Sequence, residues 1–378
     1  MYYNTMCEHS VSALGFGAMR LPVVDGQEGQ PDEQAVFEMV DYALEHGVNY
    51  FDTAWGYHDG QSEIVMGRAL ARHPRESYYL ATKFPGYDVG NFGKVEQIFE
   101  KQLEKCGVDY FDFYLCHNVC ELNINQYLDD ARFGTVSYLL EQKKAGRIGH
   151  LGFSAHGNRD TFGRFVGAYG DQMDFCQIQL NYMDWDFQDA KAKVELLRER
   201  NIPIVVMEPL RGGALISFTD DEAAALSDLR PDASAVEWAF DYVQGIDGVA
   251  VVLSGMSNFD QLKQNIDIFD QKHALNEAEC AALYKIAADK VAKTALPCTK
   301  CRYCVSHCPM QLDIPRLIEL YNEHTSREGF AFIAPMALAA MPADKQPSAC
   351  IGCGACEAVC PQQLPIPDTF AKFAELLG

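Results

Sequence analysis

Short apolar runs alternate with amphipathic stretches over the first two thirds of the chain. Apolar residues recur at helical spacing between the runs, as in Val36–Leu44, which ends near Gly47, and in Val95–Leu103, which stops at Gly107. The runs, which predict strands, are Ala13–Phe16, Tyr50–Thr53, Tyr79–Lys83, Phe111–His117, Ile148–Phe153, Phe175–Gln179, Ile204–Met207 and Val249–Leu253.

Strands that alternate with helices form parallel sheets through βαβ units. Eight such units match a closed (β/α)8 TIM barrel in both count and length. The alternative is an open doubly wound sheet, but the G-x-G-x-x-G turn expected after its first strand is missing. We therefore predict an α/β chain whose residues 1–275 form a barrel, followed by a helical linker over residues 276–296.

A cysteine motif appears twice in the last third of the chain. Each copy reads C-x2-C-x2-C-x3-C-P, which is the spacing of two-cluster ferredoxins. The copies are Cys298, Cys301, Cys304 and Cys308 before Pro309, and Cys350, Cys353, Cys356 and Cys360 before Pro361. We therefore predict that residues 297–378 form a small, mostly helical ferredoxin-type domain. Its spacer between the motifs shows helical patterns near residues 315–321 and 331–340.

The spacing also suggests which cysteines share a cluster. In two-cluster ferredoxins, the fourth cysteine of each motif ligates the neighbouring cluster. We expect one [4Fe–4S] cluster on Cys298, Cys301, Cys304 and Cys360, and the other on Cys350, Cys353, Cys356 and Cys308. The alternatives are a zinc site and a disulfide framework. Structural zinc sites have no use for the third cysteine of each triplet, and disulfide frameworks are typical of small secreted domains.

The charge and hydrophobicity of the chain limit the kinds of partner and the cellular compartment that we expect. With 31 basic and 53 acidic residues, the chain carries a net charge of −22, which disfavours nucleic acid because phosphate binding needs a basic face. An acidic ferredoxin would also be repelled at long range, unless a local basic patch offsets the field. No run approaches the roughly 20 apolar residues that cross a bilayer, and the N-terminus lacks the features of a signal peptide. We expect no membrane partner and a reducing cytoplasm, which also suits the six other cysteines, Cys7, Cys106, Cys116, Cys120, Cys176 and Cys280.

The barrel region resembles the aldo-keto reductase family over nearly its whole length. Residues 47–57 read G-V-N-Y-F-D-T-A-W-G-Y, similar to the family signature G-x-x-x-F-D-T-A-x-x-Y, and Ser62–Glu63 follow. The resemblance implies a catalytic tetrad of Asp52, Tyr57, Lys83 and His117. Each lies at or just beyond the carboxyl end of a predicted strand, which is the face where barrel enzymes place their chemistry.

The tetrad residues have distinct expected roles. Reducing a carbonyl requires hydride at carbon and a proton at oxygen, and Tyr57 would be the general acid. A phenol with a pKa of about 10 releases its proton poorly at neutral pH, so we expect the Lys83 ammonium to lower that pKa. Asp52 would hold Lys83, and a neutral His117 would orient the carbonyl oxygen. Structural packing of Asp52, Lys83 and His117 is the alternative.

The resemblance also implies a nicotinamide cofactor, NADPH or NADH, lying across the carboxyl ends of the strands. The implied contacts are Ser154, His156, Gln177, Met207, Pro209, Leu210, Arg211, Gly212, Gly255, Ser257, Gln261 and Asn265. Taken singly, such polar residues also serve as helix caps and loop turns. Trp55, Tyr182 and Trp185 are candidates for the substrate pocket, or for plain packing.

Three positions depart from the family pattern. Ala155 stands where an Asn commonly follows the carboxamide-binding Ser, and Met207 replaces the aromatic residue that often stacks under the nicotinamide. No basic residue for a 2′-phosphate is evident at Gly255–Asn258. The choice between NADPH and NADH therefore stays open, with family habit favouring NADPH.

The two domains suggest three functional hypotheses. The first is an NAD(P)H-dependent oxidoreductase that reduces a carbonyl or oxidises an alcohol and whose clusters are structural or redox-sensing. In the second, the clusters relay single electrons between a redox partner protein and a flavin or redox-active substrate in the barrel, although no flavin signature is evident. In the third, the barrel is only a scaffold for an electron-transfer module. The intact tetrad argues against the third.

Overall fold

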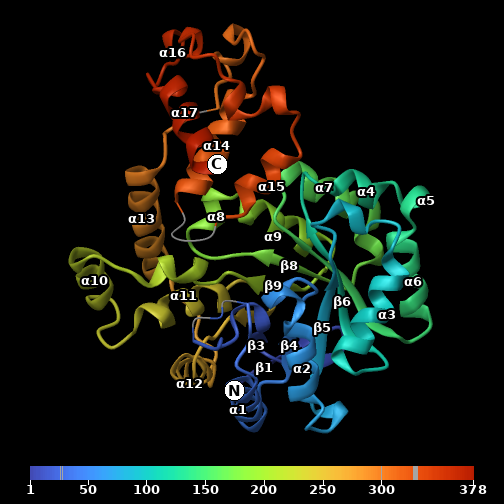
Figure 1. Cartoon of the computed structure of the whole chain (residues 1–378). Helices are drawn as coiled ribbons and strands as arrows, with labels where there is room; N and C mark the ends of the chain where they lie inside the picture. The colour runs from blue at the N-terminus through green and yellow to red at the C-terminus, as the bar shows by residue number, and fades with distance from the viewer. Residues whose placement is uncertain (26, 28, 299, 327–330) are drawn as a thin grey trace. The chain divides into compact units, whose positions relative to one another are not determined.

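The computed structural model describes residues 1–25, 27, 29–298, 300–326 and 331–378, which form two compact units (Figure 1). The barrel unit comprises Met1–Cys280, and the cluster unit comprises Ala281–Gly378. The division falls inside helix α13 (Glu277–Thr294), within the segment that we predicted as a helical linker.

Eight parallel strands close into a barrel, as the apolar runs predicted. The order around the barrel is β10-β3-β4-β5-β6-β7-β8-β9. The strands are β3 (Leu14–Gly17), β4 (Tyr50–Asp52), β5 (Tyr79–Phe84), β6 (Phe111–Val119), β7 (Ile148–Ala155), β8 (Phe175–Gln179), β9 (Ile204–Met207) and β10 (Val249–Ser254). Because both faces of such strands are covered, they read in the sequence as nearly continuous apolar runs. The predicted TIM-barrel fold is confirmed.

Helices surround the barrel strands (Figure 1). Helix α1 (Glu33–Glu45) starts at Asp32, whose carboxylate accepts a hydrogen bond from the Ala35 amide, and α3 (Val95–Cys106) ends at Gly107 with φ of 65°. The other helices are α2 (Ser62–Leu70), α4 (Ile124–Leu128), α5 (Asp130–Phe133), α6 (Thr135–Lys144), α7 (Arg159–Tyr169), α8 (Asp184–Phe187), α9 (Ala190–Glu199), α10 (Asp220–Ser227), α11 (Ala235–Gln244) and α12 (Phe259–Ile268).

A hairpin that the sequence pattern missed adds to the barrel core. It consists of β1 (Tyr3–Met6) and β2 (His9–Ser12), which pair antiparallel. Met6 and Val11 are buried in one apolar cluster with Tyr50 and Phe113 of the barrel strands. The hairpin therefore contributes side chains to the same core as the strands.

The cluster unit is built from helices and ligand-bearing loops. Its helices after α13 are α14 (Ile314–Thr325), α15 (Ile333–Ala339), α16 (Ala355–Ala358) and α17 (Ile366–Leu377). Helices α14 and α15 lie in the spacer between the cysteine motifs, where helical patterns were predicted. Leu317, Phe370 and Phe373 lie in its apolar core, against which Cys298 and Cys350 pack.

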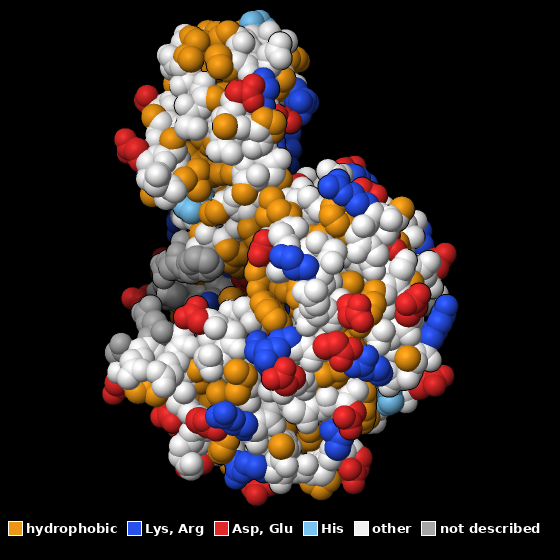
Figure 2. Space-filling model, turned by 45° about the vertical axis from the view of Figure 1, so that its right-hand side comes forward, with side chains coloured by type: hydrophobic (Ala, Val, Ile, Leu, Met, Phe, Trp, Pro, Cys, Tyr) orange, Lys and Arg blue, Asp and Glu red, His pale blue; other side chains and the backbone are white. Residues whose placement is uncertain are grey.

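No helix in the described part of the chain is long and apolar enough to cross a membrane. On the face drawn in Figure 2, acidic and basic side chains are interspersed rather than separated by sign. The excess of acidic residues therefore does not form one continuous patch on that face.

Candidate active site and cluster cysteines

The four predicted catalytic residues come from three neighbouring strands. Asp52 is the last residue of β4, Lys83 is in β5 and His117 is in β6. Tyr57 begins the short 3-10 helix η2 (Tyr57–Gly60), in the loop after β4. Since β4, β5 and β6 are adjacent in the barrel, the fold brings the four residues to one place at the carboxyl ends of the strands.

Lys83 is the centre of this arrangement. Its side chain is fully buried, and its ammonium donates to Asp52 Oδ1 at 2.6 Å, to the Thr53 carbonyl at 2.7 Å and to the Tyr57 hydroxyl at 3.4 Å. A lysine ammonium has three protons, so each donor is used. The lysine is therefore fixed between the carboxylate and the phenol.

Burial decides the ionisation of the phenol. It raises the pKa of Tyr57 above the ordinary value, although the Lys83 charge acts in the opposite direction. Our expectation that Lys83 lowers the pKa therefore holds for the lysine's own effect but not for the net shift. Burial alone would lower the pKa of Lys83, but Asp52 and Tyr57 together raise it, so the ammonium stays charged. The site presents a protonated phenol beside a cation.

His117 stands next to Tyr57 as a neutral imidazole. Burial lowers its pKa well below the ordinary value, and the charges of Lys83 and His156 add to the shift. Its ring lies edge-on to Tyr57, with centroids 6.1 Å apart, and to Tyr87, at 5.4 Å. Its buried Nδ1 has no hydrogen-bond partner among the described residues. Tyr87, in the loop after β5, is a site residue that sequence reasoning missed.

The loop that carries Tyr57 is held from both sides. A Cβ on Gly56 would lie 2.3 Å from the Tyr87 hydroxyl, so only glycine fits there without displacement of Tyr87. At the other end of the loop, the Ser62 hydroxyl is 2.8 Å from the Thr53 hydroxyl and donates to the Ala18 carbonyl at 3.0 Å. These contacts fix the loop relative to β3 and β4.

Glu63 supports the strand that carries Lys83. It is fully buried, and its carboxylate accepts hydrogen bonds from Thr82 at 2.7 Å, from Gln102 at 2.6 Å and from Lys105 at 2.5 Å. Gln102 also donates to the Lys83 carbonyl at 3.0 Å. The Ser62–Glu63 pair noted in the sequence therefore positions the loop that carries Tyr57 and the strand that carries Lys83.

Three of the predicted nicotinamide contacts lie side by side on neighbouring strands. Ser154 of β7 is in register with Gln177 of β8, and the Gln177 amide nitrogen is 3.8 Å from the Met207 sulfur at the end of β9. The Ser154 hydroxyl accepts from the Asn118 amide at 2.8 Å. Gln177 Oε1 is buried and has no partner among the described residues, so it can accept a hydrogen bond from a carboxamide. The residues present therefore fit a nicotinamide.

A basic residue that the sequence did not reveal, Arg20, lies beside two glycines of the predicted cofactor contacts. The Arg20 side chain would be 3.2 Å from a Cβ on Gly255 and 3.4 Å from a Cβ on Gly212. Both glycines therefore leave room for this arginine, and Gly212 has φ of 70°. The Ser257 hydroxyl donates to the Arg20 carbonyl at 3.0 Å.

The other predicted cofactor contacts have assorted environments. Arg211 is buried, with its Nε 3.3 Å from the equally buried Asp184 carboxylate, so it anchors its own loop. Gln261 accepts from the Ser257 amide at 2.8 Å, and Asn265 donates to Ser254 at 3.0 Å. Of the remaining contacts, the His156 amide donates to Val119, Pro209 is buried, and Leu210 is half-buried in the same segment as Arg211.

The aromatic candidates for the substrate pocket divide into two kinds. Tyr182 is buried, and its hydroxyl donates to the Leu215 carbonyl at 2.7 Å. Trp55 and Trp185 are half-buried, and the Lys105 ammonium lies 4.6 Å from the Trp55 ring centroid. Tyr182 therefore acts in packing, whereas Trp55 and Trp185 keep part of their surface exposed.

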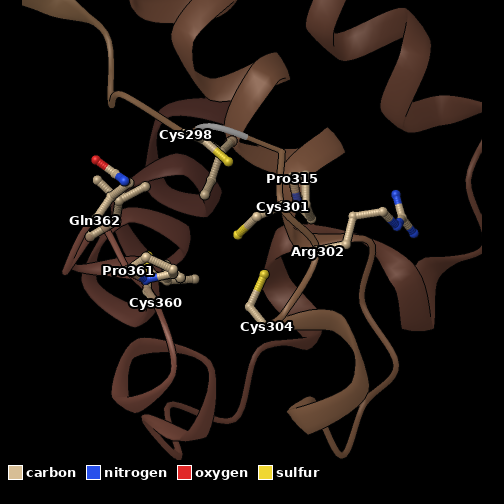
Figure 3. Close-up of a pocket in the computed structure, with 11 residues that line it drawn as sticks. Cys298, Cys301, Arg302, Cys304, Pro315, Cys360, Pro361 and Gln362 are labelled. Carbon is tan, nitrogen blue, oxygen red and sulfur yellow. The ribbon is translucent and has the colours of Figure 1, made fainter.

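Four cysteines surround one pocket of the cluster unit (Figure 3). Its walls include Cys298, Cys301 and Cys304 of the first motif together with Cys360 of the second. In Figure 3 the sulfur atoms of the first-motif cysteines face a shared space. This is the set of four that the spacing predicted for one cluster.

The remaining four motif cysteines include a second mixed group. Cys356 is buried in the apolar core of the unit, and Cys308 and Cys350 pack against that core. Cys353, from the same motif, is exposed. Within the described residues, no three His, Cys, Asp or Glu side chains are placed to hold a single metal ion.

Comparison with known proteins gives a consistent result. Residues 13–288 match the model of the aldo/keto reductase family, and residues 297–364 match that of a 4Fe-4S dicluster domain. The chain is 25% identical to an uncharacterised oxidoreductase, YqkF, of Bacillus subtilis, over 72% of this chain and 92% of that protein. It is 28% identical to an NADH-specific methylglyoxal reductase of Escherichia coli, over 54% of this chain and 66% of that protein. Among solved structures, the holo form of an aldo-keto reductase from Bacillus halodurans is similar, with 25% identity and a TM-score of 0.61, covering 76% of this chain and 95% of that one.

Proposed function

Because the chain belongs to the aldo/keto reductase family, we propose that its barrel reduces a small carbonyl compound, with Tyr57 as the general acid. The chain is an oxidoreductase that also carries an iron–sulfur domain. The observation that supports this role of Tyr57 most directly is the 3.4 Å contact between its hydroxyl and the buried Lys83 ammonium.

The proton chemistry follows from the contacts of Tyr57. Its raised pKa keeps the phenol protonated at neutral pH, so it can donate to a carbonyl oxygen that gains charge. The phenolate left behind is stabilised by Lys83, which Asp52 holds in place at 2.6 Å. The neutral His117 orients the carbonyl oxygen by a hydrogen bond. In the reverse direction, the same phenolate accepts the proton of an alcohol.

The second substrate is a nicotinamide, NADPH or NADH, which supplies hydride to the carbonyl carbon when bound. Ser154 and Gln177 would hold its carboxamide, and Met207 would lie beside its ring. Arg20, between Gly212 and Gly255, provides the positive charge for its phosphates. Gln177 Oε1, which has no partner among the described residues, supports this placement.

The eight motif cysteines hold two [4Fe–4S] clusters with ligands exchanged between the motifs. The pocket that joins Cys360 to the first motif supports this assignment. Hydride transfer moves two electrons together, whereas each cluster accepts one. We therefore assign the clusters no step in the reduction of the carbonyl.

The test is the Tyr57→Phe variant, which removes only the hydroxyl. Oxidation of NADPH and NADH would be followed with a panel of aldehydes and α-dicarbonyls that includes methylglyoxal, after the calorimetric affinity for each nucleotide is measured. A general acid contributes about 10²–10⁴-fold in rate, so turnover should fall by that factor while nucleotide affinity stays within about twofold. Unchanged turnover would exclude Tyr57 as the acid.

A further inference from the structure

The two ligand loops of the cluster unit are copies of one segment. Residues 298–319 align with residues 350–371 without a gap, so that Cys298 matches Cys350. The match extends beyond the cysteines: Ile314–Pro315 starts α14, and Ile366–Pro367 starts α17. A difference between the copies at a matched position therefore indicates a role that one loop has and the other lacks.

Two matched positions have the same backbone shape and different side chains. Gly352 and Gly354 have φ of 69° and 71°, and their counterparts Lys300 and Arg302 have φ of 56° and 66°. Left-handed backbone is unfavourable for residues with a Cβ and free of that cost for glycine. A Cβ on either glycine would meet nothing within 4 Å, so space does not explain the difference. The first copy accepts backbone strain and places two cations on its ligand loop.

Both cations are exposed, and Arg302 lies at the edge of the pocket that the four cysteines surround. The side chains of Lys300 and Arg302 are 63% and 58% exposed, Tyr303 is 61% exposed, and Cys301 between the cations is also exposed. In Figure 3 the Arg302 side chain extends away from the cysteine sulfurs. A side chain that points away from the cluster space is better placed to contact another molecule than to contact the cluster.

The acidic neighbours of these cations do not bind them tightly. Lys300 is 2.9 Å from Glu319, and Arg302 is 3.2 Å from Asp313. The carboxylates are 38% and 49% exposed. Ion pairs with this exposure contribute little and are screened by salt, so carboxylates of a partner can replace them.

Charge also distinguishes the two copies. Residues 298–319 contain three basic and two acidic residues, whereas residues 350–371 contain two acidic residues and no basic one. The whole chain has a net charge of −22. The loop over residues 300–303 is therefore a local basic and aromatic spot on an acidic protein, beside an exposed cluster ligand.

We propose that residues 300–303 are the docking site for a small acidic protein that carries single electrons. The proposal rests on the assignment of clusters to the cysteines. In the docked pair, one electron passes from the carrier to the cluster held by Cys298, Cys301, Cys304 and Cys360; the carrier is oxidised by one electron, the cluster is reduced by one, and no proton moves. The second ligand loop, without cations, does not take part in docking.

The experiment measures electron transfer from a reduced plant-type [2Fe–2S] ferredoxin, chosen for its acidic surface, to the oxidised full-length protein. Stopped-flow mixing at low ionic strength gives the second-order rate constant. Lys300→Gln/Arg302→Gln should lower it at least about tenfold and flatten its salt dependence, because charge steering accounts for factors of this size. The matched control is Lys293→Gln/Lys372→Gln, which removes two exposed cations elsewhere in the same unit and should change the rate less than about twofold.

A second variant, Lys300→Gly/Arg302→Gly, copies the other motif and relieves the left-handed strain, so it should fold at least as well and show the same kinetic loss. The docking site would be overturned by any of three results: an equal loss of rate in the control variant, no loss of rate in either Lys300/Arg302 variant, or no electron transfer to the unmodified protein. Iron and sulfide are measured first on every sample. Unmodified protein without them would refute the cluster assignment itself, whereas full clusters with an unchanged rate would refute docking alone.

Discussion

Replacing Lys83 by methionine tests the buried ion pair directly. Methionine is of similar length and apolar, so it removes the ammonium without opening a large cavity. Three hydrogen bonds are lost, to Asp52, Thr53 and Tyr57. Asp52 Oδ2 already has no partner among the described residues, and in the variant Oδ1 also loses its lysine. The substitution therefore leaves a carboxylate buried in the barrel without its cation.

The expected loss of stability follows from that uncompensated charge. Removing one partner of a buried ion pair costs about 3–5 kcal/mol in free energy of unfolding. Asp52→Asn/Lys83→Met removes both charges, and it should be more stable than Lys83→Met by at least about 2 kcal/mol. The single variant should therefore be the least stable of the set, even though it alters fewer residues than the double variant.

The stability of Lys83→Met should depend on pH through the ionisation of Asp52. Burial raises the pKa of Asp52 in the folded barrel, and without Lys83 nothing opposes the rise. A carboxyl whose pKa is higher in the folded state than its unfolded value of about 3.9 stabilises the folded state most when the pH is below that unfolded value, where the group is protonated in both states. In Lys83→Met, the free energy of unfolding should then fall by up to ~1.4 kcal/mol per pH unit as the pH rises towards the raised pKa. The double variant should lack this slope.

The assay is urea unfolding followed by tryptophan fluorescence. All three tryptophans, Trp55, Trp185 and Trp238, lie in the barrel unit, so this signal separates the barrel from the cluster unit. Iron–sulfur absorbance is recorded in parallel as a control for the cluster unit. If Lys83→Met were as stable as the double variant, or if its loss did not change with pH, the reasoning from a buried uncompensated carboxylate would be wrong.

Three further predictions concern cofactors and acidity. Anaerobically purified protein should contain about eight iron and eight sulfide per chain by chemical analysis, and two zinc ions without sulfide would contradict the cluster assignment. Calorimetry should show about tenfold weaker nucleotide binding for Gln177→Ala, because a hydrogen bond of about 1.4 kcal/mol is lost. Arg20→Gln should weaken the binding of NADPH more than the binding of NADH, and equal effects on the two nucleotides would place the 2′-phosphate elsewhere. Because the raised pKa keeps Tyr57 protonated, initial rates of carbonyl reduction should be flat through neutral pH and decline only above about pH 10, and a decline near pH 7 would point to another acid.

The sequence predicted the barrel because its strands are buried on both faces. Phe111–Val119 and Ile148–Ala155 are examples whose apolar runs could be read directly. The hairpin was missed because β2 reads His9-Ser-Val-Ser12, in which only Val11 is apolar. Two-residue alternation over so short a segment does not stand out until the barrel core that it packs against is known.

The sequence could place the four proposed catalytic residues together because each has a fixed place relative to a strand end. Arg20 and Tyr87 could not, because their neighbours come from distant parts of the chain: Arg20 lies beside Gly212 and Gly255, and Tyr87 beside Gly56 and His117. The direction of the net shift in the pKa of Tyr57 could not be predicted from the sequence either. It depends on burial of the phenol, which sequence spacing does not report.

The pocket shared by the two cysteine motifs has a consequence for the order of events during synthesis. Cys298, Cys301 and Cys304 leave the ribosome before Cys360, because the chain is made from its N-terminus. At about 5–20 residues per second, the ribosome takes several seconds to pass from the first motif to the second. During that interval the first three thiols lack their fourth partner, whereas the barrel strands are already complete. With the ligands exchanged as we propose, loading of this cluster follows barrel synthesis. A nascent chain arrested between the motifs would then have a complete set of barrel strands but no complete site for the cluster.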